Sequence, residues 1–149
     1  MKILKLLALT VTGLLLAGCV TTTPVDSQAR ALCVQTFGTD AYFKVIWLPV
    51  SHTEEFASAF LGYTGPQLEI ASAMKAGKDK RVDLVVWSEP HGGATAAIDK
   101  ALRYIPEEER LVNLNFLFVG DASDADYLRD EIRATGAKFY FHQSDKPST

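Results

Sequence analysis

The sequence predicts a single α/β domain built on a mostly parallel, four-stranded sheet, with helices on both faces of the sheet in three layers. Apolar, β-branched segments alternate along the chain with segments whose apolar residues recur at helical spacing, which is the pattern of βαβ units. The chain has 149 residues, of which 48% are hydrophobic, and this suits one domain of ordinary size.

Four apolar segments predict the strands, namely residues 42–48, 82–87, 111–119 and 137–141. The end of the third segment, Phe116–Val119, is apolar on both faces and therefore indicates a central strand covered by helices. The fourth alternates between apolar and polar residues, which is typical of an edge strand. A Rossmann-like or flavodoxin-like strand order, 2-1-3-4, with right-handed crossovers would place the two most hydrophobic strands at the centre.

Helical spacing of apolar residues, together with capping and stop residues, predicts the helices. The first, Ser27–Phe37, stops at Gly38, although a short strand through Leu32–Thr36 competes with it. The remaining helices are expected from Thr53 to Gly62, from Pro66 to Gly77, from Gly92-Gly93 to Ile105, and from Asp121 or Ser123 to Gly136.

The first 18 residues have the layout of a secretory signal peptide, with Lys2 and Lys5 before an apolar run that is too short to span a bilayer. This run ends in Leu16-Ala17-Gly18-Cys19, which resembles the lipobox of bacterial lipoproteins. The resemblance implies cleavage before Cys19, a diacylglyceryl group on its sulfur and an acyl chain such as palmitate on its new amino group. The alternative is an ordinary signal peptide with a cysteine there by chance.

By analogy with enterobacterial lipoproteins, Val20 in place of an aspartate after Cys19 implies the outer membrane, with the domain on the periplasmic face. Residues 19–26 are predicted to form a lipidated tether, residues 27–142 the single domain, and residues 143–149 a polar tail. The seven residues after the lipidated cysteine, Val20–Asp26, reach only about 25 Å when fully extended. The domain is therefore expected to stay close to its membrane.

Composition and charge exclude several classes of protein. A net charge of −3 argues against nucleic-acid binding, which requires clustered cations. The two cysteines are too few for a disulfide-stapled scaffold or a cysteine zinc site. If a lipid occupies Cys19, Cys33 is either a small buried hydrophobe among apolar neighbours or a reactive thiol that forms an intermolecular disulfide.

Polar side chains and glycines follow every predicted strand, at the edge where open parallel sheets bind ligands. The candidate binding residues at this edge are His52, Glu89, His91, Gly92, Gly93, Asp121 and His142. Imidazole and carboxylate groups are ligands for zinc or copper, but the three histidines have no local ligand spacing, so we predict no metal and no cofactor.

The Gly92-Gly93 pair at a helix start has two interpretations. Its backbone amides could hold an anion, as in the oxyanion loop that His91-Gly92-Gly93 resembles in some esterases. Alternatively, small residues are needed there for close packing of the helix. The chain has no Gly-x-Ser-x-Gly elbow and no nucleophile with a base at a defined spacing, so we expect no enzymatic activity.

Together, these features predict an outer-membrane lipoprotein that acts as a binding or scaffolding component of an envelope assembly, such as a secretion, conjugation or pilus machine. Its partners would be the membrane, through the lipid anchor, and a protein of the cell envelope, with no nucleic acid. The alternative is a small periplasmic ligand- or metal-binding protein, or an enzyme, that uses the loops at the carboxyl edge of the sheet.

Overall fold

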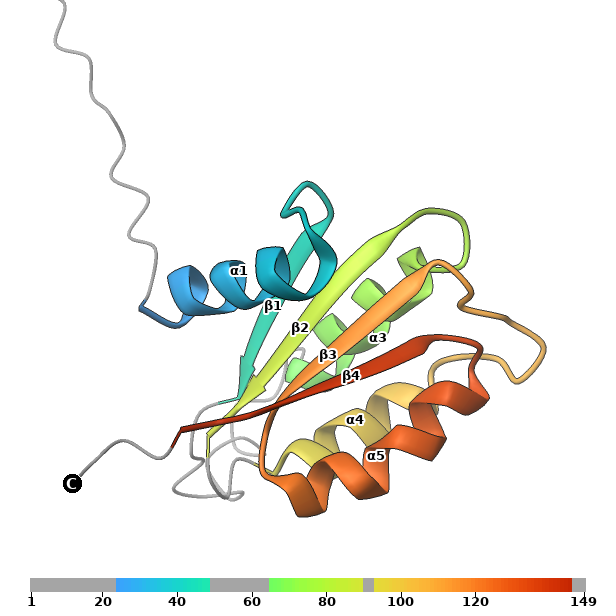
Figure 1. Cartoon of the computed structure of the whole chain (residues 1–149). Helices are drawn as coiled ribbons and strands as arrows, with labels where there is room; N and C mark the ends of the chain where they lie inside the picture. Colours follow the sequence, from blue (N-terminus) through green and yellow to red (C-terminus); the bar gives the residue numbers. More distant parts are fainter. Residues whose placement is uncertain (1–23, 49–64, 90–92, 146–149) are drawn as a thin grey trace, which may run out of the picture.

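A computed structural model describes residues 24–48, 65–89 and 93–145, and confirms the predicted α/β class with a parallel four-stranded sheet (Figure 1). The described elements, in chain order, are α1 (Pro24–Phe37), β1 (Phe43–Leu48), α3 (Pro66–Ala76), β2 (Val82–Ser88), α4 (Ala94–Leu102), β3 (Leu114–Gly120), α5 (Ala122–Ala134) and β4 (Lys138–Gln143). The predicted helix Thr53–Gly62 lies outside the described residues. Within those residues, no helix is long and apolar enough to cross a bilayer.

The strands pair in chain order, β1-β2-β3-β4, so the predicted order 2-1-3-4 is wrong. β1 lies at an edge because its side chains are not covered on both faces: Lys44 and Trp47 are exposed, whereas Ile46 and Leu48 are buried. Its run of aromatic and β-branched residues resembled a central strand. β2 and β3 are the interior strands, and β4 lies at the other edge, as its alternating pattern predicted.

The crossover helices all pack on one face of the sheet. Each crossover connection is right-handed, and each leads to the next strand in the same direction across the sheet. The helices in these connections therefore lie on the same face. The main core lies between this face and α3, α4 and α5, and its largest fully buried side chains include Phe116, Phe118, Ile70, Met74 and Ile98. On the second face, Ala29 and Cys33 of α1 pack against Val85, Leu117 and Val119.

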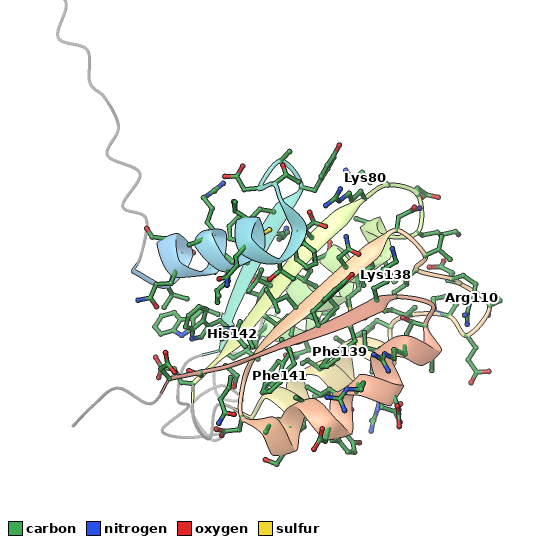
Figure 2. All side chains as sticks on the ribbon, viewed as in Figure 1. Lys80, Arg110, Lys138, Phe139, Phe141 and His142 are labelled. Atoms are coloured by element: carbon green, nitrogen blue, oxygen red, sulfur yellow. The ribbon has the colours of Figure 1, made fainter. Side chains whose placement is uncertain are left out.

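The described residues cover the second face only in part, so among them the predicted third layer does not extend over the whole sheet. In Figure 1, α1 lies over β1 and β2, and nothing is drawn in front of β4. The exposure of Lys138 and His142 at the two ends of β4 agrees with this view. Figure 2 shows both side chains on the α1 side of β4, whereas Phe139 and Phe141 point toward α4 and α5.

The parallel register arranges the α1 face of the sheet in rows that cross all four strands. The amino-end row consists of Phe43, Asp83, Asn115 and Lys138, and the carboxyl-end row of Trp47, Trp87, Val119 and His142. A middle row of Val45, Val85, Leu117 and Tyr140 separates them. The two outer rows therefore lie at opposite ends of the same face, and they differ in chemistry: one is polar and charged, the other aromatic.

Helix α1 begins at Pro24, so Pro24–Asp26 belong to the helix and not to the predicted tether. Proline is favoured in the first turn because its missing N–H group has no acceptor there. The helix ends at Gly38, which has φ of 77° and donates its N–H to the Val34 carbonyl at 2.8 Å. The chain then turns directly into β1, so α1 runs back over the sheet and begins on the side toward which the strands run (Figure 1).

Candidate binding groove

The structure describes four of the seven residues predicted at the carboxyl edge, namely Glu89, Gly93, Asp121 and His142. His52, His91 and Gly92 lie outside the described residues. Glu89 follows β2 and donates its N–H to the Leu48 carbonyl at 3.0 Å, whereas exposed His142 belongs to β4. β3 lies between them, which separates their backbones by about 10 Å. The described residues hold no group of three or more side chains able to bind a metal ion.

Gly93 is required by its backbone conformation and not by close packing. It is the N-cap of α4 with φ of 67°, a value that favours glycine, and a Cβ atom there would meet nothing within 4 Å. The interpretation of Gly93 as a small residue needed for close packing is therefore wrong. Asp121 is half-buried at the N-cap of α5, where its side chain makes no capping hydrogen bond.

A groove of about 390 Å³ lies at the opposite end of the strands, between the last turn of α1 and the uncovered half of the sheet. It lies mainly over the amino-end row and the middle row. Its lining is largely polar and consists of Thr36, Phe37, Arg81, Val112, Asn113, Asn115, Lys138 and Tyr140. The groove is thus formed where α1 ends and β4 is left uncovered.

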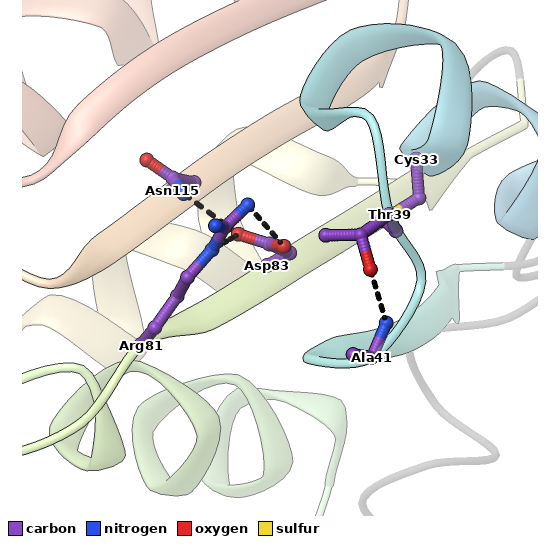
Figure 3. A network of polar contacts seen from close by, with 6 residues as sticks. All are labelled: Cys33, Thr39, Ala41, Arg81, Asp83 and Asn115. Carbon is purple, nitrogen blue, oxygen red and sulfur yellow. Dashed lines mark hydrogen bonds and ion pairs between the residues drawn. The ribbon is translucent and has the colours of Figure 1, made fainter.

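A buried carboxylate, Asp83, holds two of the lining residues, Arg81 and Asn115, through the network of polar contacts in Figure 3. The Asp83 side chain is fully buried in the interior strand β2. Its Oδ1 accepts hydrogen bonds from Arg81 Nε at 3.1 Å and from Asn115 Nδ2 at 2.7 Å, and its Oδ2 accepts one from Arg81 Nη2 at 3.0 Å. Both oxygens are therefore satisfied, which a buried charge requires.

The charge of Lys138 is left uncompensated beside this network. Asn115 and Lys138 are register partners on β3 and β4, and both line the groove, so Lys138 brings a positive charge to its open edge. Lys138 is exposed, and no carboxylate of the described residues forms an ion pair with it. Because Asp83 neutralises Arg81, the groove retains one surplus positive charge.

One end wall of the groove is aromatic. The ring of Phe37, the last residue of α1, meets the ring of Tyr140 edge to face, with centroids 5.0 Å apart and an interplanar angle of 87°. Across the groove, Arg81 lies over the ring of Tyr42 at 4.9 Å from its centroid, which holds the guanidinium in place. Two fixed walls and a hydrogen-bonded floor give the groove a defined shape.

Cys33 lies behind the groove and is buried and unpaired. Its Sγ donates a weak hydrogen bond to the Thr39 carbonyl at 3.5 Å. Burial raises the pKa of the thiol to about 11, and the carboxylates of Asp83 and Asp40 add to the rise. The thiolate is the nucleophilic form of cysteine, so this environment agrees with a buried hydrophobe and not with a reactive thiol.

No known protein family, curated protein or solved structure matches this chain.

No local motif marks the groove residues in the sequence, because they come from separate strands, from the segments before them and from α1. The usable signal is that the last three strands each carry one polar residue at or next to their first residue, namely Asp83, Asn115 and Lys138. Polar residues at matching positions of neighbouring parallel strands fall side by side, so they form a cluster.

Proposed function

We propose that the protein is an outer-membrane-anchored periplasmic lipoprotein that acts as a binding or scaffolding component of an envelope assembly, and that the groove accepts an anionic group of its protein partner. The observation that carries the groove's role is the uncompensated Lys138 ammonium beside a fixed polar floor. A carboxylate is the protein group that suits this charge, and Arg81 and Asn115 already bind one in Asp83.

The proposed anchor agrees with a domain that works by recognition at one membrane. With α1 starting at Pro24, only residues 20–23 separate the helix from Cys19, so the tether cannot exceed about 17 Å. Such a tether keeps the domain beside the membrane and presents it to a partner in the same envelope region. Holding the domain this close favours contact with other components at that membrane.

Lipidation is tested by Cys19→Ser. We expect the variant to move from the membrane fraction to the soluble periplasmic fraction, because three acyl chains anchor almost permanently whereas the serine protein has none. Mass spectrometry of the amino-terminal peptide should show the acyl groups in the wild type. A variant that remains in the membrane, together with a wild-type peptide free of acyl mass, contradicts the anchor.

The groove is tested by Lys138→Glu, with Lys100→Glu as the matched control. Lys100 lies on α4, on the opposite face of the sheet, and both lysines are exposed. After crosslinking in intact envelopes, the wild type and the control should recover the same partner. Lys138→Glu should weaken recovery about tenfold, equivalent to about 1.4 kcal/mol, because it places like charges together. Equal recovery with both variants would move the partner's contact surface away from the groove.

A further inference from the structure

Both tryptophans of the chain belong to the carboxyl-end row. Trp47 and Trp87 are register partners on β1 and β2, so their backbones lie about 4.8 Å apart and their side chains project from the same face. The Trp47 side chain is 42% exposed, and Trp87 is half-buried against the cluster that includes α1. The row therefore carries a partly exposed indole pair at one corner of the domain.

The chain leading to the proposed lipid starts from this same end of the molecule. Helix α1, which starts at Pro24, runs back over the sheet, so its first turn lies toward the carboxyl ends of the strands (Figure 1). Residues 20–23 allow no more than about 17 Å between Pro24 and Cys19. Acyl chains on Cys19 would thus hold this end of the domain, and not the groove end, close to the bilayer.

We propose that this corner docks onto the bilayer that holds the anchor, with the indoles of Trp47 and Trp87 in the interfacial layer of the lipid. The inference depends on the proposed anchoring at Cys19. Indoles are enriched at membrane interfaces because their rings are apolar and their N–H group still finds a hydrogen-bond partner among the headgroups.

A small contact is sufficient in this arrangement. A short tether raises the effective concentration of the patch at the membrane to about the millimolar range, so two indoles can dock although they would not bind vesicles from solution.

Docking would also set the direction in which the groove faces. Helix α1 has 14 residues and spans about 20 Å, and its last turn forms one wall of the groove. With the tryptophan corner on the bilayer, the groove opens at the end of the domain that is turned away from the lipid. A partner could then reach Lys138 without competing with the membrane.

Tryptophan fluorescence reports on this corner alone, because the chain has no other tryptophan. The lipidated protein is reconstituted into phosphatidylcholine vesicles with brominated acyl chains, and Cys19→Ser serves as the lipid-free control. We expect bromine to quench the lipidated protein, with emission shifted to shorter wavelength, and to leave the control unchanged. The single-tryptophan variant Trp87→Phe should be quenched more than Trp47→Phe, because Trp47 is the more exposed residue.

A second route to the membrane separates failure of docking from failure of the anchor. The chain beginning at Cys19 is coupled through that thiol to a maleimide lipid, while buried Cys33 stays unmodified. Missing acyl mass in the cellular protein contradicts the anchor, and the coupled chain still tests docking. A coupled chain that floats with the vesicles but shows no bromine quenching overturns docking. If cell-wall glycan fragments shield the tryptophans and bromine does not quench them, docking is overturned and the corner is a glycan-binding surface.

Discussion

Replacing Val86 by aspartate is expected to lower the free energy of unfolding by several kcal/mol. Val86 is fully buried in β2, where it belongs to the main core beneath the crossover helices. A carboxylate there has no cationic partner among the core residues, and an unpaired buried charge costs about 3–5 kcal/mol. This loss is comparable to the whole stability of many domains, which is about 5–15 kcal/mol. Circular dichroism during urea titration measures the effect.

The matched control for this variant is Val112→Asp. Val112 is 57% exposed in the turn before β3, so the same substitution there leaves the new carboxylate in water. We expect the control to unfold within about 0.5 kcal/mol of the wild type, as is usual for surface changes. Equal urea midpoints for Val86→Asp and the wild type would contradict the placement of β2 in the interior of the sheet.

Replacing Arg81 by methionine is the second change with a large expected effect. The guanidinium provides two of the three side-chain hydrogen bonds to Asp83, which is fully buried. Methionine keeps much of the length of the side chain but leaves the Asp83 carboxylate with Asn115 as its remaining side-chain donor. A buried carboxylate deprived of its cation costs about 3 kcal/mol. The urea midpoint should fall accordingly, with the fold retained at low urea concentration.

The double variant Arg81→Met, Asp83→Asn shows whether the charge is responsible. An amide at position 83 removes the unpaired charge and can still accept the hydrogen bond from Asn115, so we expect it to recover most of the lost stability. This positive coupling is the signature of an ion pair in a double-mutant cycle. Additive losses in the two single variants and the double variant would show that Arg81 acts through packing and not through Asp83.

The fold class and the interior position of β3 follow from the sequence because burial leaves a direct pattern in the residues. Phe116–Val119 is apolar on both faces, and only a strand covered on both sides tolerates that. Strand order leaves a weaker pattern. β1 looks central by its composition, yet Lys44 and Trp47 face solvent at the edge of the sheet. Periodicity shows which side of a strand is buried, but not which strand lies beside it.

The candidate site depends on the order of the strands, so it could not be predicted without that order. Open parallel sheets bind ligands at the carboxyl ends of their strands, and this rule led to the predicted site. In the described part of that edge, β3 lies between Glu89, which follows β2, and His142 of β4. The groove lies at the amino end, where Asp83, Asn115 and Lys138 become neighbours only through the register β2-β3-β4. Side chains far apart in the sequence form a site only when the pairing of the strands is known.

The strand order β1-β2-β3-β4 also affects how the chain can assemble during synthesis. Every strand pairs with the strand that precedes it, so each βαβ unit closes between neighbours in the sequence and the sheet grows in one direction. Pairing between strands that are neighbours in the sequence closes shorter loops than pairing between more distant strands, and therefore costs less entropy. A chain that emerges amino end first can therefore add β2 to β1, β3 to β2 and β4 to β3 in turn, and no strand waits for a partner synthesised much later.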